Sequence, residues 1–314
     1  MNPIGGYFEL ELPCGEEYHK NAIRLNTGRN AFEYILRAKR YKKVFLPYYT
    51  CDVMLEPVQK LKLNYEFYHI DQTFKPDFDF TNIKQDDVFV YNNYFGVCDK
   101  QVNEVAKKCK NLIIDNSQAF YSKPLPGIDT FYSPRKFFGV PDGAYLYTCK
   151  KLEIKFEQDI SYKRFEHLLG RIDINAENFY SSFKKNDDSL IGQPIMKMSN
   201  LTRRLLQGID YKSIAQKRRD NFLYIQDKFI NSNQIEFFIS QNSVPMVYPY
   251  LIRDGNILKQ KLIMNKIFVA TYWPNVLKWC NPNMFEYNLM LNLLPLPIDQ
   301  RYSKNDLKRI VELI

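Results

Sequence analysis

Hydrophobic and polar positions over the first 150 residues alternate between two patterns. Short runs rich in β-branched and aromatic residues predict strands. These runs occupy residues 43–47, 65–71, 87–93, 111–117 and 143–149. Amphipathic or cap-led segments between them predict helices at 29–40, 51–63 and 99–108, with Asp99 as the N-cap of the third. This alternation is typical of an α/β layer structure with a largely parallel sheet.

The pattern changes after about residue 150, where charged, helix-like sequence continues to residue 229. A second alternating section then predicts strands at 235–240, 246–252 and 266–273 and a closing helix at 303–313. A chain of 314 residues is long for one ordinary core. We therefore expect a large α/β domain over 1–205 and a small α+β domain over 206–314, with the boundary inside a long helix near residue 206.

The composition, 45% hydrophobic and 15% aromatic, indicates a chain that folds throughout. No apolar run approaches the ~20 residues that span a bilayer, and the N-terminal sequence lacks a basic segment followed by an apolar one. We expect a cytoplasmic protein that does not associate with a membrane. The six cysteines form no CxxC pair and have no His at ligand spacing, so neither disulfides nor a metal site is expected.

The net charge of +9 raises the question of a nucleic-acid partner. Lys and Arg occur in short groups such as RAKRYKK and QKRRD, which are typical of solvated helix faces. No recognition helix, zinc finger or aromatic RNA-binding signature accompanies them, so no nucleic-acid binding is expected. Attraction of a small anionic substrate fits the charge equally well.

Candidate chemistry lies at the predicted strand ends, where open α/β sheets bind ligands. Gly28 stands in LNTGRNAF, before an amphipathic helix whose free N–H groups would suit a phosphate, although an ordinary turn explains it too. An apolar strand ends in Asp115, and Gln118 follows three residues later. A carboxylate at a strand end is often only a helix cap. Ser133 and Lys136 lie in a turn before the next strand, where Lys136 is either a Schiff-base lysine or a surface residue.

Together these segments resemble the DegT-type sugar aminotransferases, a family of fold type I pyridoxal-phosphate enzymes. The resemblance runs in order along most of the chain. Its motifs are Asn26-Thr27-Gly28-Arg29, Leu46-Pro47-Tyr48-Tyr49-Thr50, Asp115-Asn116-Ser117-Gln118, Ser133-Pro134-Arg135-Lys136 ahead of Asp142-Gly143-Ala144, and the closing LPLPIDQRYSKNDLKRIVELI. It implies an aspartate-aminotransferase-like large domain with a mostly parallel seven-stranded sheet, followed by a small C-terminal α+β domain.

The resemblance also implies the cofactor, pyridoxal 5'-phosphate, with pyridoxamine phosphate as the intermediate form. Lys136 would bind it covalently and move the substrate proton, while Asp115 would pair with the pyridine nitrogen and keep it protonated. Gln118 would contact the ring or its phenolic oxygen. The phosphate would lie on Ser133 and on the backbone N–H groups of Thr27, Gly28 and Arg29.

Three positions depart from the family pattern. Arg29 replaces a usual Thr, and it either adds charge to the phosphate site or points to solvent. Cys51 aligns near the aromatic residue that stacks on the ring, so Tyr49 is our candidate substitute. Residues 170–199 lack the loop that reaches the neighbouring subunit's cofactor; Asn186 is a candidate for that role, against a solvent-facing position in KKNDD.

The implied reaction moves an amino group from glutamate to a nucleotide-linked keto sugar, for the amino sugars of bacterial surface polysaccharides. A homodimer is implied as well. Tyr272 and Trp273 either line the sugar pocket or pack in the core. Three alternatives stay open: a keto-sugar dehydratase, against which the retained Lys136 argues because those enzymes carry His there; a regulatory, non-enzymatic relative; and a basic α/β binding module without cofactor.

Overall fold

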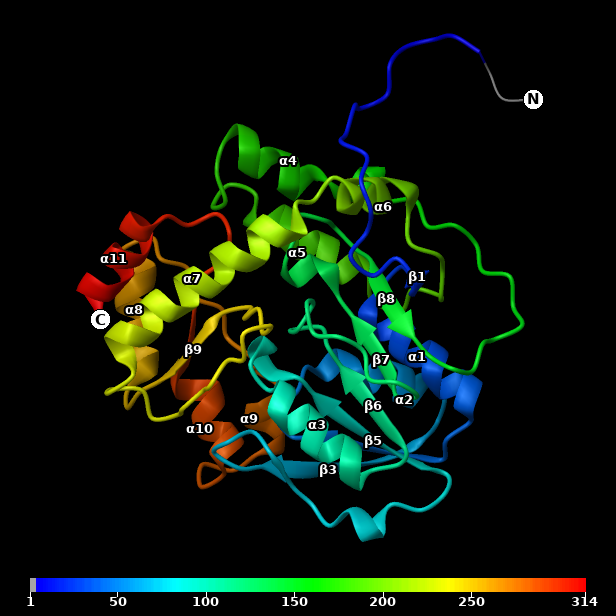
Figure 1. The fold of residues 1–314 in the computed structure, drawn as a ribbon, viewed down its shortest axis with the longest axis horizontal. Coiled ribbons are helices and arrows are strands. Elements are labelled where there is room, and N and C mark those ends of the chain that lie inside the picture. Colours follow the sequence, from blue (N-terminus) through cyan, green and yellow to red (C-terminus); the bar gives the residue numbers. More distant parts are fainter. Residues whose placement is uncertain (1–3) are drawn as a thin grey trace.

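Eight strands form one sheet in the computed structural model, which describes residues 4–314 (Figure 1). Their order is β1 (Ile23–Leu25), β8 (Ala144–Tyr147), β7 (Asp129–Tyr132), β6 (Leu112–Asp115), β5 (Asp87–Asn92), β2 (Lys43–Pro47), β3 (Asn64–Ile70) and β4 (Pro76–Asp77). The run from β3 through β2, β5 and β6 to β7 is parallel. β8 is antiparallel to both its neighbours, and β4 is antiparallel to β3. The carboxyl ends of the parallel strands therefore meet at one edge.

All five strands predicted in the first 150 residues are present, and β2 has the predicted bounds. The expected mostly parallel seven-stranded sheet is confirmed, and the two-residue strand β4 adds an eighth. The hydrophobic pattern missed β1 and β7. These strands have only three and four residues, too few for a period to be read from the sequence.

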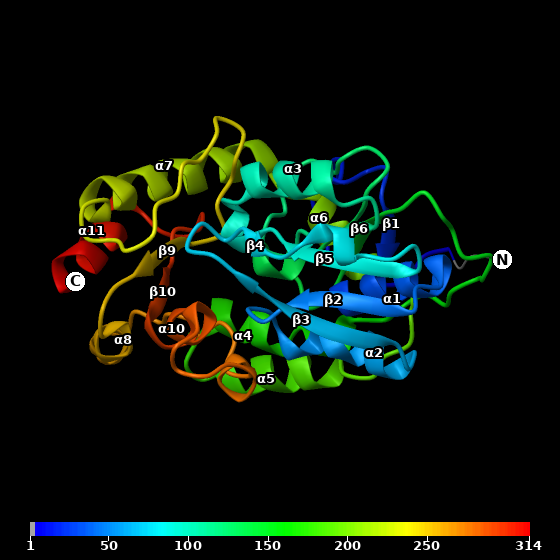
Figure 2. The same ribbon diagram turned by 90° about the horizontal axis from the view of Figure 1, so that it is seen from below.

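The sheet is buried on both faces, and residues along each strand point alternately to the two sides. In β5, Val88 and Val90 pack with α1 (Gly28–Lys39) and α2 (Leu55–Lys60), whereas Phe89 and Tyr91 belong to the opposite core. That second core contains α3 (Asp99–Lys108) and extends into the C-terminal part of the chain. Figure 2 shows α1 and α2 on the side of the sheet opposite α3.

Two predicted helices begin for different reasons. Thr27 caps α1, because its hydroxyl oxygen accepts a hydrogen bond from the Asn30 amide at 3.1 Å. Asp99 was predicted to cap the third helix, and this is wrong: Asp99 is already inside α3. Its carboxylate instead accepts hydrogen bonds from the side chains of Asn93 and Ser122, which joins α3 to the ends of the neighbouring loops.

The C-terminal part contains a second, antiparallel sheet of β9 (Tyr248–Leu251) and β10 (Leu293–Leu296). Helices surround this pair in Figure 1. They are α7 (Tyr211–Phe229), α8 (Gly255–Met264), α9 (Val276–Trp279), α10 (Phe285–Asn292) and α11 (Lys304–Leu313). β10 and α11 match the closing strand and helix that the resemblance implied.

Two predictions for this part are wrong, because residues 235–240 and 266–273 form no strand. The long helix expected around residue 206 is divided into α6 (Asn200–Gln207) and α7. The domain boundary near residue 206 stays a prediction. Two further helices, α4 (Glu166–Asp173) and α5 (Tyr180–Ser189), lie in the connection between β8 and α6.

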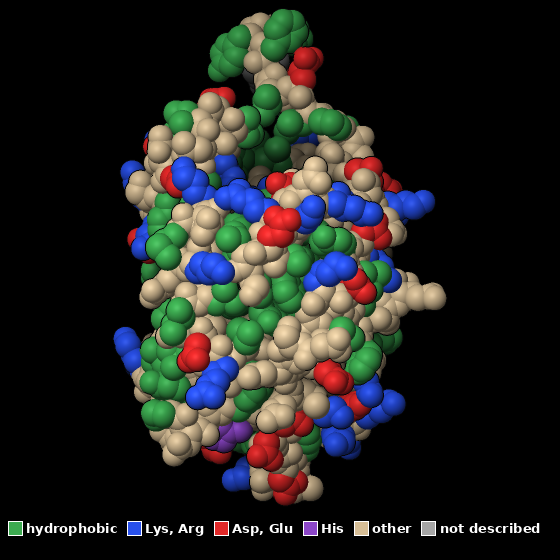
Figure 3. Space-filling view, turned by 90° about the vertical axis from the view of Figure 1, so that its left-hand side faces the viewer, with side chains coloured by type: hydrophobic (Ala, Val, Ile, Leu, Met, Phe, Trp, Pro, Cys, Tyr) green, Lys and Arg blue, Asp and Glu red, His purple; other side chains and the backbone are tan. Residues whose placement is uncertain are grey.

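The surface carries mixed charge on the face formed by the C-terminal part. Figure 3 shows Lys and Arg side chains there interspersed with acidic and apolar ones. Across residues 4–314, no helix combines the length and the apolar character needed to cross a bilayer.

Candidate active site

A cavity of about 340 Å³ opens where the parallel strands end. Its walls come from the residues that follow β2, β5, β6 and β7, from the first turn of α1, from the end of α5, and from Trp273. Seven of the eight residues predicted for the site line it. They are Thr27, Gly28, Arg29, Asp115, Gln118, Ser133 and Lys136. Segments separated by more than 100 residues in the sequence thus converge on one cavity, as the strand-end argument predicted.

The first turn of α1 contributes backbone donors to this cavity. The N–H groups at the start of a helix have no acceptor within it, and the helix dipole adds positive potential there. Gly28 keeps this turn open: a Cβ at this position would lie 3.6 Å from Ser117 Oγ and 3.9 Å from the Phe131 ring, which both line the cavity. The missing side chain therefore leaves space for an anion against the backbone.

Arg29 lies beside this turn and does not point to solvent. Its side chain is 13% exposed, and its Nη1 lies 2.5 Å from a carboxylate oxygen of Glu56. The second Glu56 oxygen accepts a hydrogen bond from the Gly192 amide at 2.9 Å. The solvent-facing alternative for Arg29 is therefore wrong, and its charge beside this turn is paired with Glu56.

Asp115 ends β6, and its carboxylate accepts a hydrogen bond from the Ser117 amide at 2.7 Å. Burial raises the pKa of Asp115, although the Ser117 bonds and the positive charge of Lys136 oppose that rise. A cation placed against this carboxylate would stabilise its charged form and lower its pKa.

Lys136 ends the short 3₁₀ helix η4 (Pro134–Lys136), which begins after Ser133. Its Nζ lies 6.0 Å from the centroid of the Tyr272 ring. The carbonyl of the next residue, Phe137, accepts hydrogen bonds from Gln300 at 2.9 Å and from the buried Arg218 at 3.3 Å. The C-terminal part of the chain therefore fixes the backbone that presents Lys136.

Gln118 contributes an unused donor. Its Oε1 accepts a hydrogen bond from the Phe95 amide at 3.0 Å, which fixes the side chain. Its Nε2 is buried and has no hydrogen-bond partner among residues 4–314. Because an unpaired buried donor is unfavourable, a ligand acceptor in the cavity would satisfy it.

Tyr49, the predicted stacking residue, is not part of the cavity wall. Its ring is fully buried and packs against Trp273, with 4.8 Å between the ring centroids. Trp273 itself lines the cavity, as does Cys51. The prediction for Tyr49 is therefore corrected: the aromatic wall is Trp273, which Tyr49 supports from behind. Of the two alternatives for Trp273, the cavity wall holds, whereas Tyr272 lies outside the lining.

The end of α5 closes another side of the cavity through Asp187, Asp188, Leu190 and Ile191. Asp187 forms an ion pair with Arg135, the residue before Lys136. Of the two alternatives for Asn186, the solvent-facing position is wrong: it is 5% exposed and donates to the Pro141 carbonyl at 2.9 Å.

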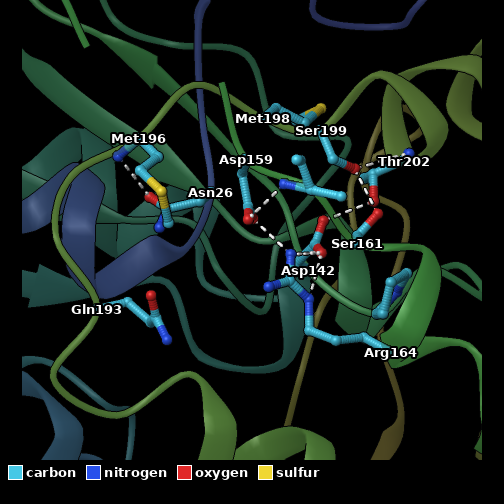
Figure 4. A network of polar contacts seen from close by, with 12 residues as sticks. Asn26, Asp142, Asp159, Ser161, Arg164, Gln193, Met196, Met198, Ser199 and Thr202 are labelled. Carbon is cyan, nitrogen blue, oxygen red and sulfur yellow. Dashed lines mark hydrogen bonds and ion pairs between the residues drawn. The ribbon is translucent and has the colours of Figure 1, made fainter. Parts of the chain in front are cut away.

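A buried polar network holds the connection that carries α4 and α5 (Figure 4). Arg164, in the 3₁₀ helix η5 (Tyr162–Arg164), binds Asp142 at 2.6 Å and also pairs with Asp159. Thr202 donates to the other Asp142 oxygen at 2.5 Å. Asn26 accepts from the Met196 amide at 3.2 Å, so the same connection is also attached to the start of α1.

Several cavity residues were not predicted from the sequence. Asn92 and Asn93 end the apolar strand β5, so the strand-end argument applied to Asp115 would have found them. Arg135 lies in the same turn as Ser133 and Lys136, so the prediction of that turn would have found it, whereas only the packing of α5 over the strand ends brings Asp187 to the cavity.

This architecture is shared with the sugar aminotransferases of known structure, and it confirms the predicted aspartate-aminotransferase-like fold. The proposed sugar aminotransferase Spr1654 from Streptococcus pneumoniae is 18% identical, with a TM-score of 0.65 over 93% of this chain and 84% of that one. CalS13, a sugar aminotransferase from Micromonospora echinospora, is 14% identical, with a TM-score of 0.64 over 94% and 87%.

A DegT DnrJ EryC1 StrS aminotransferase from Brucella abortus is 13% identical, with a TM-score of 0.61 over 93% of this chain and 84% of that one. Spr1654 is known in PLP and PMP forms. Neither a protein-family model nor a curated protein matches the chain by sequence.

Proposed function

We propose that this protein is a pyridoxal-phosphate-dependent aminotransferase of the DegT type. The observation that carries the proposal is the convergence of Lys136, Asp115 and the open first turn of α1 on one cavity. A lysine, a partly buried carboxylate and a helix N-terminus are the groups that an aldehyde, a protonated ring nitrogen and a phosphate require. The shared fold with sugar aminotransferases supports the same assignment.

The residues present fit this cofactor. The open backbone at Gly28 and the neighbouring Arg29 would hold the phosphate, with the Ser133 hydroxyl as a further donor. The unpaired Nε2 of Gln118 would donate to the phenolic oxygen. Trp273 would cover one face of the ring, at the position where Cys51 has no aromatic surface to offer.

When bound, pyridoxal phosphate supplies an electron sink for the substrate carbon and carries the amino group between two substrates. Lys136 holds the cofactor and then moves a proton to and from the reacting carbon through Nζ. Asp115 would hold a proton on the ring nitrogen through mutual stabilisation of the two charges. Burial raises the pKa of Asp115, and a protonated nitrogen beside the carboxylate would lower that pKa again. Leu190 and Ile191 add apolar surface to the cavity wall.

For the substrates, we infer that glutamate donates the amino group and that a nucleotide-linked keto sugar accepts it. The net charge of +9 suits anionic substrates of both kinds. The expected pathway is amino-sugar supply for bacterial surface polysaccharides.

A homodimer is part of the proposal. The N-terminal segment extends away from the body of the molecule in Figure 1, and it exposes Tyr7 at 97% and Phe8 at 93%. Apolar side chains presented in this way are typical of an interaction surface. The mass of the protein in solution, measured by light scattering, tests this part; a monomer at micromolar concentration would contradict it.

The visible absorption spectrum of the purified protein with pyridoxal phosphate tests the function. We expect a cofactor band that disappears on addition of glutamate in the wild type and does not form covalently in Lys136→Ala. A cofactor band that does not change when glutamate is added would indicate the dehydratase or regulatory alternative. A protein that binds no cofactor would leave only the basic α/β binding module.

A further inference from the structure

Arg135 is the cavity cation for which the proposed function has no role. Lys136 is assigned to the cofactor, and Arg29 is paired with Glu56 beside the phosphate position. Arg135 lines the same cavity, and its only hydrogen bond within the described chain goes to Asp187. Only one nitrogen of Arg135 takes part in that contact, although a guanidinium can present two parallel N–H donors to a carboxylate.

The Arg135–Asp187 pair is poised to exchange partners. Asp187 is 49% exposed and Arg135 is 21% exposed, so water competes for both charges and the pair contributes little to stability. A ligand carboxylate that enters the cavity would offer Arg135 the same chemistry with a second oxygen. The protein therefore carries a carboxylate of its own where an anionic substrate group would lie.

The end of α5 is held independently of this ion pair. Asn186 donates to the Pro141 carbonyl, the Gly192 amide donates to Glu56, and Asn30 donates to the Gln193 carbonyl at 2.9 Å in each case. Arg135 can thus release Asp187 while α5 keeps its place and its apolar residues continue to cover the cavity.

We propose that Arg135 binds a carboxylate of the amino donor and that Asp187 occupies that subsite until the donor arrives. The assignment rests on the proposed aminotransferase function and deepens it. Arg135 directly precedes Lys136, so an amino acid held by its carboxylate at Arg135 has its amino group within the same cavity as the cofactor. The residue is substrate-binding, and it selects an amino acid over an amine without a carboxylate.

The test compares Arg135→Gln with Asp187→Asn, using two carboxylate probes. L-Glutamate is titrated by the loss of the cofactor band. Glutarate, which has two carboxylates and no amino group, is titrated by calorimetry. Arg135→Gln should weaken both by about 10- to 100-fold, the loss expected for a charge-assisted hydrogen bond. Asp187→Asn should strengthen both by about two- to fivefold, because it removes a competitor held by an exposed ion pair.

The matched control is Lys185→Gln, which also removes one positive charge but lies on the exposed side of α5, outside the cavity lining. It should leave both affinities unchanged. Weakening by Lys185→Gln equal to that by Arg135→Gln would assign the effect to net charge and overturn the proposal. Weakening by Asp187→Asn would also overturn it, because the pair would then be a structural contact.

Calorimetry with uridine diphosphate separates the carboxylate from a substrate phosphate as the anion. Its affinity should be unchanged in Arg135→Gln; selective loss of this affinity would reassign Arg135 to the nucleotide. The cofactor band keeps the two proposals apart. If the wild-type band responds to glutamate and Arg135→Gln matches the wild type, only the role of Arg135 fails. If the wild type forms no band, the proposed function itself fails.

Discussion

The ion pair between Arg164 and Asp142 gives the sharpest prediction about stability. Asp142 is fully buried and Asp159 is 5% exposed, and Arg164 forms an ion pair with each of them (Figure 4). Replacing Arg164 by Met keeps the aliphatic packing and leaves two buried carboxylates without their cation. Breaking a buried pair in this way costs about 3–5 kcal/mol, a large part of the ~5–15 kcal/mol that stabilises a typical protein.

The loss should also depend on pH. Burial raises the pKa of Asp142, while Arg164 and the Thr202 hydroxyl oppose that rise. Without Arg164, the folded state binds a proton at Asp142 more tightly than the unfolded state does. Unfolding then releases that proton, so the stability of the variant falls as pH rises through the raised pKa and recovers as pH is lowered.

Urea unfolding followed by circular dichroism, at a series of pH values, measures both effects. Arg253→Met is the matched control, because Arg253 is 91% exposed and lies 3.9 Å from the exposed Asp254. It should change stability by less than about 0.5 kcal/mol. The reasoning is refuted if Arg164→Met loses no more than this control, or if its deficit is the same at every pH.

Three further predictions concern the cavity. Gly28→Val should weaken cofactor binding, measured by fluorescence titration, while urea unfolding of the cofactor-free protein changes by about 1 kcal/mol or less, because its Cβ meets only ordinary contacts. Cofactor affinity should fall as pH drops through the raised pKa of Asp115, and Asp115→Asn should abolish that dependence and slow the glutamate reaction by about 100- to 1,000-fold. Trp273→Ala should weaken cofactor binding more than Trp273→Phe, which keeps an aromatic face; equal losses would contradict the stacking role.

The central sheet was predictable because its strands are apolar on both faces. β2 and β5 read as continuous hydrophobic runs, and the pairing of parallel strands then places their polar ends together. The same signal misled us at 235–240, which pairs with no strand: the Phe237 carbonyl accepts a hydrogen bond from the side chain of Gln226 in α7.

The site was predictable as far as it lies on strand ends and the turn before α1. Asp115 and Lys136 could be found because each follows or precedes a strand. Trp273 and Asp187 reach the cavity through the packing of distant segments, which no local pattern records. The prediction of Tyr49 as the stacking residue failed for the same reason. Tyr49 is close to Cys51 in sequence, but its ring packs behind Trp273, which comes from the C-terminal part of the chain.

The identity of the cofactor-bearing lysine tests the central claim most directly. The protein is incubated with pyridoxal phosphate, reduced with borohydride, digested and examined by mass spectrometry. We predict one pyridoxyl group, on the peptide that contains Lys136, and its loss in Lys136→Ala. Stoichiometric modification of another lysine in place of Lys136, or no modification of the folded protein, would contradict the account.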